Sequence, residues 1–267
     1  MKVLKKMMVI VLILALALTC VACGSKSSAA SGSSTPTIDA IKQKGKLVMM
    51  TNASFPPFEY IDAKGNVAGV DIDLSQKIAD ELGVELEIVD MDFDLLIDAL
   101  KNGKGDLVAA GMTATAARAE IIDFSDIYIS MGLKVIVPAG TDIKAFDDLA
   151  GKKIAVQEAT TAHIYVQENY PDAEILPFKS AIDAGNSVKS GNSDCAVIDL
   201  LPAEYMTANS DAIDLMDGLL SAEDTAMGVA KGHEDLLAVV NKVLQECMSN
   251  GYLDQQFDAH MVNFDLG

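Results

Sequence analysis

Beyond residue 36, the hydrophobic positions change period repeatedly, which predicts helices and strands in alternation. Leu74, Ile78 and Leu82 are four residues apart, as on one face of a helix, and Gly83 follows where helices commonly end. The next residues, 84–88, alternate between apolar and acidic, as in a strand with one buried face. This stretch therefore predicts a helix over 71–82 followed directly by a strand.

The same reasoning predicts further elements along the rest of the chain. The helices are expected at 38–44, 93–100, 161–170, 181–190 and 233–250, and the strands at 47–51, 106–110, 153–156, 175–177 and 196–198. Strands that alternate with helices form parallel sheets covered on both faces. Because the pattern extends over roughly 230 residues, more than one sheet comfortably uses, we expect two α/β lobes.

The composition indicates a folded chain and limits its partners. Hydrophobic residues make up 50% of the 267 residues, enough to form a core, which excludes disorder for most of the chain. The 20 basic and 39 acidic side chains give a formal charge of −19. Such an acidic surface repels phosphate groups, so we expect no nucleic-acid partner and no basic patch for anionic lipid.

The N-terminus has the layout of a secretory signal peptide. Lys2, Lys5 and Lys6 precede an apolar run over 7–18, and small residues then lead to a cysteine. We therefore expect residues 1–22 to be a signal peptide and the protein to be exported. Serine occupies six of the next positions 24–35, a composition that cannot form a core and is typical of a flexible tether.

The residues around Cys23 resemble the lipobox of bacterial lipoproteins, in which this cysteine becomes the new N-terminus and carries a lipid. Cys20 departs from that motif, because it occupies a position usually held by leucine. The resemblance implies that Cys23 is lipidated, that residues 23–35 tether the protein, and that it works at the extracellular face of the cell membrane. Cleavage without lipidation is the alternative.

Two cysteines lie in the folded part, Cys195 and Cys247. We expect both to be buried and free, because the predicted elements place them in different lobes. A disulfide between them is the alternative, since the expected location outside the cytoplasm permits one.

The common catalytic and nucleotide-binding motifs GxGxxG, GxxxxGK[ST], GxSxG and HExxH are absent from the sequence. Asp90, Asp92 and Asp94 resemble the start of a calcium loop, but Leu95 and Lys101 occupy the positions that need glycine and glutamate. We therefore expect no metal and no cofactor.

Five blocks, in order, carry a resemblance to a known family. They are KLVMMTNASFPPFEY (46–60), GVDIDLSQKIADELGV (69–84), MDFDLLIDALKNGKGDLVAAGMTATAARAEIIDFSDIY (91–128), DDLAGKKIAVQEATT (147–161) and SDCAVIDLLPAEY (193–205). Together they resemble the polar amino-acid family of periplasmic-type solute-binding proteins, family 3, the extracellular receptors of ABC importers. The resemblance covers nearly everything after the tether.

The resemblance implies a periplasmic-binding-protein type II fold, with two Rossmann-like α/β lobes joined by two hinge strands like a Venus flytrap. It places the hinges near 128–132 and 223–227. Lobe 1 would then contain residues 36–130 and 228–267, and lobe 2 residues 131–227. The ligand, a free L-amino acid, would bind in the cleft, and the lobes would close around it before delivery to the permease. We expect a monomer.

A closed cleft that holds a zwitterion must neutralise both of its ends, because an unpaired buried charge is expensive. Arg118 suits the carboxylate, since a guanidinium binds a carboxylate with two parallel hydrogen bonds. By the resemblance, Thr113, five residues earlier, and Thr161, from lobe 2, also contact the carboxylate. Asp199 would take the ammonium together with the carbonyl of Gly111. The alternatives are an exposed helical arginine at 118 and a helix N-cap at 199.

The remaining expected ligand contacts follow the same resemblance. Phe55 and Phe93 match the aromatic positions that sandwich the ligand's aliphatic body, with core packing as the alternative; Phe58 is expected to be structural. The other expected contacts are Asn52, Met112, Gln157 and Thr160. The free N–H groups at the start of the predicted helix, around Thr160 and Thr161, favour an anion there.

Three positions depart from the family pattern. Asn52 stands where many relatives carry aspartate, Gln157 where some carry lysine, and Ala159 where a glycine is common. Without an acid at position 52, a cationic ligand loses an obvious partner, so we expect a polar, uncharged side chain. Glu59 and Asp92 could still reach the pocket, which keeps a cationic ligand open.

Two other functions are compatible with this architecture. A few relatives are enzymes, such as cyclohexadienyl dehydratases, and others are sensor modules. An enzyme needs an acid–base group against the reacting carbon of its substrate. Arg118 and Asp199 are instead suited to holding a ligand, and no histidine or lysine stands at a matched pocket position. We therefore expect a binding protein and not an enzyme.

Overall fold

The computed structural model describes residues 37–262. The predicted signal peptide (1–22), the lipidated Cys23 and the tether (23–35) lie outside the described residues. Within the range 37–262, no helix is both long and apolar enough to cross a membrane.

Lobe 1 is built on a five-stranded sheet with the strand order β5-β1-β6-β14-β7. These strands are β1 (Lys46–Thr51), β5 (Glu85–Asp90), β6 (Leu107–Val108), β7 (Ile122–Phe124) and β14 (Gly228–Ala230). β1 pairs in parallel with β5 and β6, whereas β14 runs antiparallel to β6 and β7. A small antiparallel sheet of β2 (Ser54–Phe55), β3 (Glu59–Ile61) and β4 (Val67–Ala68) follows β1 in the chain.

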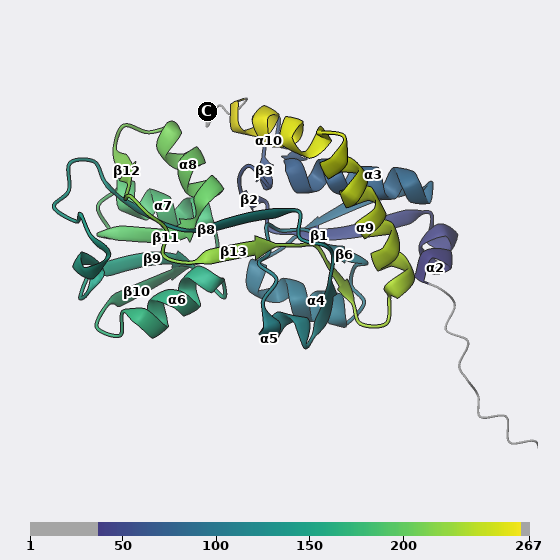
Figure 1. Cartoon of the computed structure of the whole chain (residues 1–267), viewed down its shortest axis with the longest axis horizontal. Helices are drawn as coiled ribbons and strands as arrows, with labels where there is room; N and C mark the ends of the chain where they lie inside the picture. Colours follow the sequence, from purple (N-terminus) through teal and green to yellow (C-terminus); the bar gives the residue numbers. More distant parts are fainter. Residues whose placement is uncertain (1–36, 263–267) are drawn as a thin grey trace, which may run out of the picture. The chain divides into compact units, whose positions relative to one another are not determined.

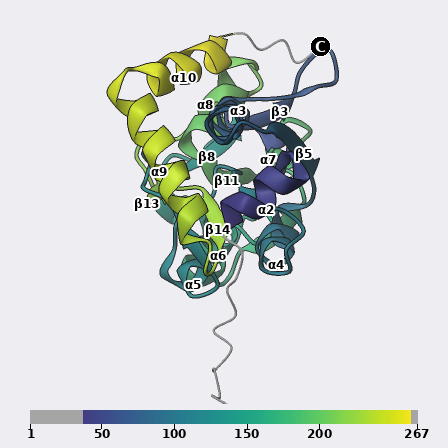
Figure 2. The same ribbon diagram turned by 90° about the vertical axis from the view of Figure 1, so that its right-hand side faces the viewer.

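Six helices surround the sheet of lobe 1. They are α2 (Thr37–Lys44), α3 (Val70–Leu82), α4 (Leu96–Lys101, preceded by a 3-10 turn at Phe93–Leu95), α5 (Ala116–Ala119), α9 (Glu234–Ser249) and α10 (Tyr252–Val262). α9 packs against both α2 and α3, and α10 packs against α9 and α3. Figure 2 shows α9 and α10 along one side of the lobe. The apolar stripe of α9, from Leu236 to Cys247, is buried as expected.

Lobe 2 is built on a six-stranded sheet with the path β10-β9-β11-β8-β12, and β13 pairs with β8. The strands are β8 (Ile129–Pro138), β9 (Lys153–Gln157), β10 (Glu174–Phe178), β11 (Cys195–Asp199), β12 (Ile213–Leu215) and β13 (Ala222–Thr225). A 3-10 turn at Phe146–Leu149 precedes β9, and the helices are α6 (Thr161–Asn169), α7 (Ala181–Lys189) and α8 (Leu200–Ala208). The edge strand β10 and strand β11 both pair in parallel with β9, whereas β8 runs antiparallel to β11, β12 and β13.

The chain passes between the lobes along β8 and β13. The first residues of β8 pair with β13, from Ile129 opposite Thr225 to Gly132 opposite Ala222. Its later residues pair with β11, where Leu133 lies opposite Asp199. Figure 1 shows both strands crossing the middle of the described structure. One long strand therefore leads from the first lobe into the centre of the second sheet.

The two α/β lobes predicted from the sequence are confirmed, as is the helix expected over 71–82. α3 spans Val70–Leu82 and ends at Gly83, whose φ of 71° is the left-handed conformation that glycine adopts easily. The expectation of wholly parallel sheets is wrong in part, because the return strands β14, β8, β12 and β13 run antiparallel. Cys195 and Cys247 are both buried and free, as expected.

Candidate functional site

A cavity of about 290 Å³ lies between the lobes. Its lining residues come from both lobes: Asn52, Phe55, Glu59, Phe93, Ala110, Gly111, Thr113 and Arg118 from lobe 1, and Gln157, Thr160, Thr161 and Asp199 from lobe 2. The structure therefore brings together all the expected ligand contacts except Met112.

Met112 does not line the cavity. Its side chain is 1% exposed and packs in the core of lobe 1, in the same cluster as Leu96 and Ile122. Its carbonyl oxygen accepts a hydrogen bond of 3.1 Å from the N–H of Ala226. The backbone of Met112 thus connects the loop that contains Gly111 and Thr113 to the segment after β13. Its side chain points into the core because successive side chains of this extended segment alternate in direction.

Arg118 lies in α5, a helix of four residues that is capped by Thr115, whose hydroxyl accepts from the Arg118 N–H. The Nη1 atom of Arg118 donates to the carbonyl of Thr113 at 2.9 Å, and Nη2 donates to the carbonyl of Ala159 at 3.1 Å. The guanidinium carbon lies 5.3 Å from the centre of the Phe93 ring, within range of a cation–π interaction. Arg118 therefore connects lobe 1 to lobe 2 at the cavity.

The guanidinium of Arg118 is the positive end of the site. Burial lowers its pKa, and the negative charges of Asp199 and Glu223 oppose this change. An arginine remains a cation under such conditions, because its ordinary pKa is above 12. The planar fork of Arg118 carries five N–H donors, more than its two carbonyl partners require, so it can also bind a carboxylate.

Two threonines face each other across the cavity. The hydroxyl oxygens of Thr113 and Thr161 are 3.5 Å apart. Thr161 begins α6, where the first N–H groups of the helix have no partner within it and favour an anion. Thr160, by contrast, uses its hydroxyl locally, because it donates to the Gln157 carbonyl and accepts from the His163 N–H. Thr161 is thus better placed than Thr160 to offer a hydroxyl to a ligand.

Asp199 is the negative end of the site. It is 5% exposed, and its Oδ1 atom has no hydrogen-bond partner among the described residues. Although Asp199 occupies the N-cap position of α8, its side chain makes no capping hydrogen bond. Burial, and secondly the charge of Glu223, raise the pKa of Asp199 to about 7, while Arg118 acts in the opposite direction. A cationic group in the cavity would therefore find an unpaired acceptor.

Gly111 and Phe55 shape the floor of the cavity. The φ of Gly111 is 52°, and a Cβ atom at this position would lie 2.6 Å from the Phe55 ring. Both the backbone conformation and the close approach therefore require glycine. Phe55 is buried and its ring lies beside that of Phe58, which is fully buried in the core, as expected of a structural residue.

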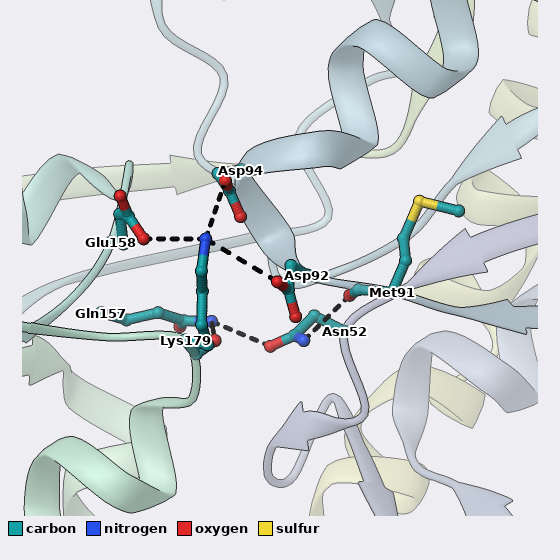
Figure 3. A network of polar contacts seen from close by, with 7 residues as sticks. All are labelled: Asn52, Met91, Asp92, Asp94, Gln157, Glu158 and Lys179. Carbon is teal, nitrogen blue, oxygen red and sulfur yellow. Dashed lines mark hydrogen bonds and ion pairs between the residues drawn. The ribbon is translucent and has the colours of Figure 1, made fainter.

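A polar network crosses between the lobes beside the cavity. The side chain of Gln157 donates from Nε2 to Asn52 Oδ1 at 2.9 Å. Next to this pair, the Lys179 ammonium lies 2.9 Å from Asp94 and 2.8 Å from Glu158, with Asp92 at 3.7 Å. Figure 3 shows the lysine between these acids and the Asn52–Gln157 pair close to them. The three acids, two from lobe 1 and one from lobe 2, thus share one cation.

Ala159 holds a strained conformation next to Arg118. Its φ is 62°, and among the described residues other than glycine it alone has a positive φ. Such a conformation costs a side-chain-bearing residue about 1–3 kcal/mol. The family resemblance implies glycine at this position. Ala159 adopts the left-handed conformation that suits glycine, and it does so at an energetic cost. The carbonyl of this strained residue accepts from Arg118 Nη2.

Two lining residues were not among the expected ligand contacts, Ala110 and Glu59. Glu59 was noted only as an acid able to reach the pocket, yet it is 0% exposed and lies between two buried aromatic residues, Phe58 and Tyr60. An acid within the largely apolar stretch FPPFEY was the signal that could have identified it. Lys179 also escaped notice, because nothing in its local sequence indicates the acids of the other lobe.

Comparison with known proteins agrees with this geometry. The family model for bacterial extracellular solute-binding proteins, family 3, matches residues 47–262. The arginine-binding extracellular protein ArtP of Bacillus subtilis (strain 168) is 31% identical over 259 residues, covering 94% of this chain and 96% of ArtP.

Two solved structures are also similar. A P235GK mutant of ArgBP from T. maritima has a TM-score of 0.80 and 39% identity, covering 84% of this chain and 98% of that chain. The ancestral amino acid-binding protein AncCDT-1, a precursor of cyclohexadienyl dehydratase, has a TM-score of 0.80 and 34% identity, covering 84% and 99%. The chain belongs to the bacterial extracellular solute-binding proteins of family 3, and its two lobes have the type II periplasmic-binding-protein fold.

Proposed function

We propose that this protein captures a free L-amino acid in the cavity between its lobes and delivers it to the permease of an ABC importer. The observation that carries the proposal is the unpartnered Oδ1 of buried Asp199, which shares one cavity with the guanidinium of Arg118. A buried carboxylate without a partner is costly, and an ammonium group in the cavity would remove that cost. The opposite charges suit the two ends of a zwitterion.

The remaining groups fit the same ligand. Arg118 would bind the carboxylate with two parallel hydrogen bonds, and Thr113 and Thr161 would add hydroxyl or N–H donors from the two lobes. The Gly111 carbonyl would join Asp199 at the ammonium. Because contacts come from both lobes, the ligand would stabilise the closed arrangement over an open one. The relatives named for binding arginine or amino acids support this class of ligand.

The side chain of the ligand would extend toward Asn52 and Gln157, with Phe55 and Phe93 on its flanks. The amide pair supports a polar side chain, and its lack of charge favours an uncharged one. Arginine is the competing ligand, because two relatives are named for binding it and the acid Glu59 lines the same cavity. These two candidates differ by one charge, which makes them easy to separate by measurement.

The closing movement would occur where β8 and β13 cross between the lobes. We place the hinges near 128–132 and 223–227, with residues 36–130 and 228–267 in lobe 1 and 131–227 in lobe 2. A lipid on Cys23, after removal of residues 1–22, would hold a monomer beside its permease on the extracellular face of the cell membrane. The site supports binding and not catalysis, because the charged groups of the cavity are suited to the ends of the ligand.

The test is a screen of the twenty L-amino acids for a rise in the melting temperature of the purified protein, followed by calorimetry on any hit. A ligand at 100 times its Kd should stabilise the protein by about 2.7 kcal/mol. D-enantiomers and the matched variant Asp183→Asn, which changes an acid outside the cavity, serve as controls. If no amino acid shifts the melting temperature, while other small solutes do, the proposed ligand class is wrong.

A further inference from the structure

Two buried acids lie together at the lobe 1 wall of the cavity: Glu59, which lines the cavity, and Asp71. Both are 0% exposed. Glu59 begins β3 and Asp71 lies in the first turn of α3, and the N–H of Asp71 donates to the carbonyl of Phe58 at 2.9 Å. This backbone bond sets the start of α3 against β3. It therefore brings together two carboxyl groups that are separated by a turn and a hairpin in the sequence.

Asp71 has the partners of an ionised carboxylate. Its Oδ1 accepts from the Tyr128 hydroxyl at 2.7 Å, and its Oδ2 accepts from the N–H of Gly111 at 2.9 Å. A negative charge in the first turn of a helix is also favourable, because it faces the positive end of the helix dipole. Asp71 thereby holds Gly111, a cavity residue, and Tyr128, the residue directly before β8.

Glu59 has the opposite surroundings. Neither of its carboxyl oxygens accepts a hydrogen bond from an N–H or O–H group of the described residues. Asp71 is the acid beside it, and two adjacent buried carboxyl groups can share a hydrogen bond only when one of them carries the proton. Since Asp71 already accepts from two donors, Glu59 is the member that fits the role of donor.

The titratable groups that face Glu59 add to this asymmetry. They are Asp71 from α3, Asp90 from the end of β5 and the phenol of Tyr128. Burial, followed by the negative charge of Asp71, raises the pKa of Glu59 well above the range of an ordinary glutamate. Burial also raises the pKa of Asp71, to about 6, although its hydrogen bonds to Gly111 and Tyr128 oppose this change.

We propose that Glu59 holds a proton at neutral pH, donates it to Asp71, and thereby acts as a positioning residue for Gly111 in the ligand site. With this proton in place, Asp71 would accept from Glu59 in addition to Tyr128 and Gly111, and would keep Gly111 in its left-handed conformation against Phe55. Without it, two adjacent buried carboxylates repel each other and loosen the hold on Gly111. The role in ligand binding rests on the proposed function, whereas the proton on Glu59 does not.

The proton can be detected without any ligand. Because the pKa of Asp199 is raised to about 7, the infrared spectrum is recorded at pH 8 on the Asp199→Asn variant of the full protein; it should contain the carbonyl band of a protonated carboxylic acid, and adding Glu59→Gln should remove it. The variant Glu85→Gln, which changes an exposed glutamate of β5, is the control and should leave the band unchanged. A spectrum without this band, or with a band that survives Glu59→Gln, overturns the proposal.

Thermal stability gives a second measurement. A glutamate whose pKa is raised by folding makes the folded state bind more protons, so stability is lost as the pH rises above about 4.3. Asp71 and Asp199 act in the same direction, and the informative quantity is therefore the difference between the wild type and Glu59→Gln. The melting temperature of this variant should fall less between pH 5 and pH 8. An equal fall in both proteins contradicts the proposal.

Ligand affinity then tests the positioning role. Glu59→Gln keeps an N–H donor for Asp71 and should bind the amino acid found by the screen more tightly than Glu59→Leu does. Glu59→Leu has a similar size but no donor and should bind at least tenfold more weakly than the wild type. If both variants lose affinity equally, positioning through the donated proton is wrong. If Glu59 gives the acid band but the protein binds no amino acid, the proposed function is wrong and the proton on Glu59 stands.

Discussion

The Nε2 atom of Gln157 donates to Oδ1 of Asn52 at 2.9 Å, and this hydrogen bond joins the two lobes at the cavity wall. Asn52 also donates from Nδ2 to the carbonyl of Met91, and Gln157 donates to the carbonyl of Lys179. Both amides are thereby oriented by a backbone group of their own lobe. The result is a neutral bridge at the position where the side chain of the ligand is expected.

Asn52→Asp should change which amino acid binds best. The aspartate retains an oxygen acceptor for Gln157 but adds a buried negative charge, which a cationic side chain can neutralise and an uncharged one cannot. The ratio of the affinity for arginine to that for glutamine should rise by about tenfold, or about 1.4 kcal/mol. Calorimetry with the two amino acids measures it. An unchanged ratio would remove position 52 from the part of the site that contacts the side chain.

Arg118→Ala should weaken ligand binding by about 2–5 kcal/mol, roughly 30- to several-thousand-fold, because a buried carboxylate loses its cation. Arg118→Lys retains the charge but not the planar fork and should give an intermediate loss. The variant also removes the bond to the Ala159 carbonyl, so the melting temperature of the ligand-free protein is measured alongside. A loss of affinity below threefold for Arg118→Ala would falsify its role as the carboxylate clamp.

The affinity for the ligand should fall as the pH drops below about 7. The pKa of Asp199 is raised to about 7 by burial and by Glu223, so the proton must leave before the carboxylate can bind an ammonium group. Below that pH the affinity should fall by up to about tenfold per pH unit, as expected for one proton. Calorimetry between pH 5 and pH 8 measures this slope.

Asp199→Asn is the matched variant for the pH dependence. It should bind the amino acid weakly at every pH and show a flat profile over the same range. It should also weaken the binding of the amino acid more than that of the corresponding des-amino acid, which lacks the ammonium group. Equal weakening of the two compounds would reject Asp199 as the ammonium partner.

Lys179→Met should weaken ligand binding at low salt, and added salt should narrow the difference from the wild type. Lys179 neutralises acids on both lobes, and its removal leaves Asp92, Asp94 and Glu158 facing one another across the closed cleft. Because the Lys179 side chain is 51% exposed, salt screens these pairs, and the expected loss of affinity is only about two- to fivefold at low salt. Affinity measured from 20 to 500 mM NaCl is the readout, with the exposed Lys104→Met as control.

Ala159→Gly should stabilise the protein slightly. Glycine relieves the strain of the positive φ, about 1 kcal/mol or more, but increases the conformational entropy of the unfolded chain. The free energy of unfolding should rise by up to about 1 kcal/mol, as measured by urea denaturation. Ala159→Val, with a branched side chain in the same conformation, should lower it. A glycine variant that is clearly less stable than the wild type would show that position 159 carries no strain.

The sequence predicted those helices and strands that have one face buried along several turns or several alternate residues. The spacing of Leu74, Ile78 and Leu82 identified α3, and Gly83 marked its end. β6 was expected over 106–110 but spans only Leu107–Val108, because the following residues leave the sheet to form the cavity loop. β13 was expected only through the resemblance, as a hinge strand near 223–227, because its four residues, AEDT, have no apolar alternation that would predict a strand.

The candidate site was predicted largely through the family resemblance, which placed Arg118, Thr161 and Asp199 on opposite sides of one cleft. Local sequence gave no indication that the side chain of Met112 points into the core. The contacts of Glu59 with Asp71, and of Lys179 with Asp94, could not be predicted either. They join elements that the chain brings together only on folding, and no periodicity relates the two members of each pair.

The loop that carries Gly111 and Thr113 into the cavity is hydrogen-bonded to the end of β13. Thr113 forms a bridge with Thr225, the N–H of Ala114 donates to the carbonyl of Asp224, and the N–H of Ala226 donates to the carbonyl of Met112. The backbone around Thr113, which would contact the carboxylate, is thus hydrogen-bonded to the backbone around Thr225, which would have to twist when the lobes move apart. We therefore expect ligand binding to change the angle between the lobes, and we propose that a permease recognises the filled receptor by this change of shape.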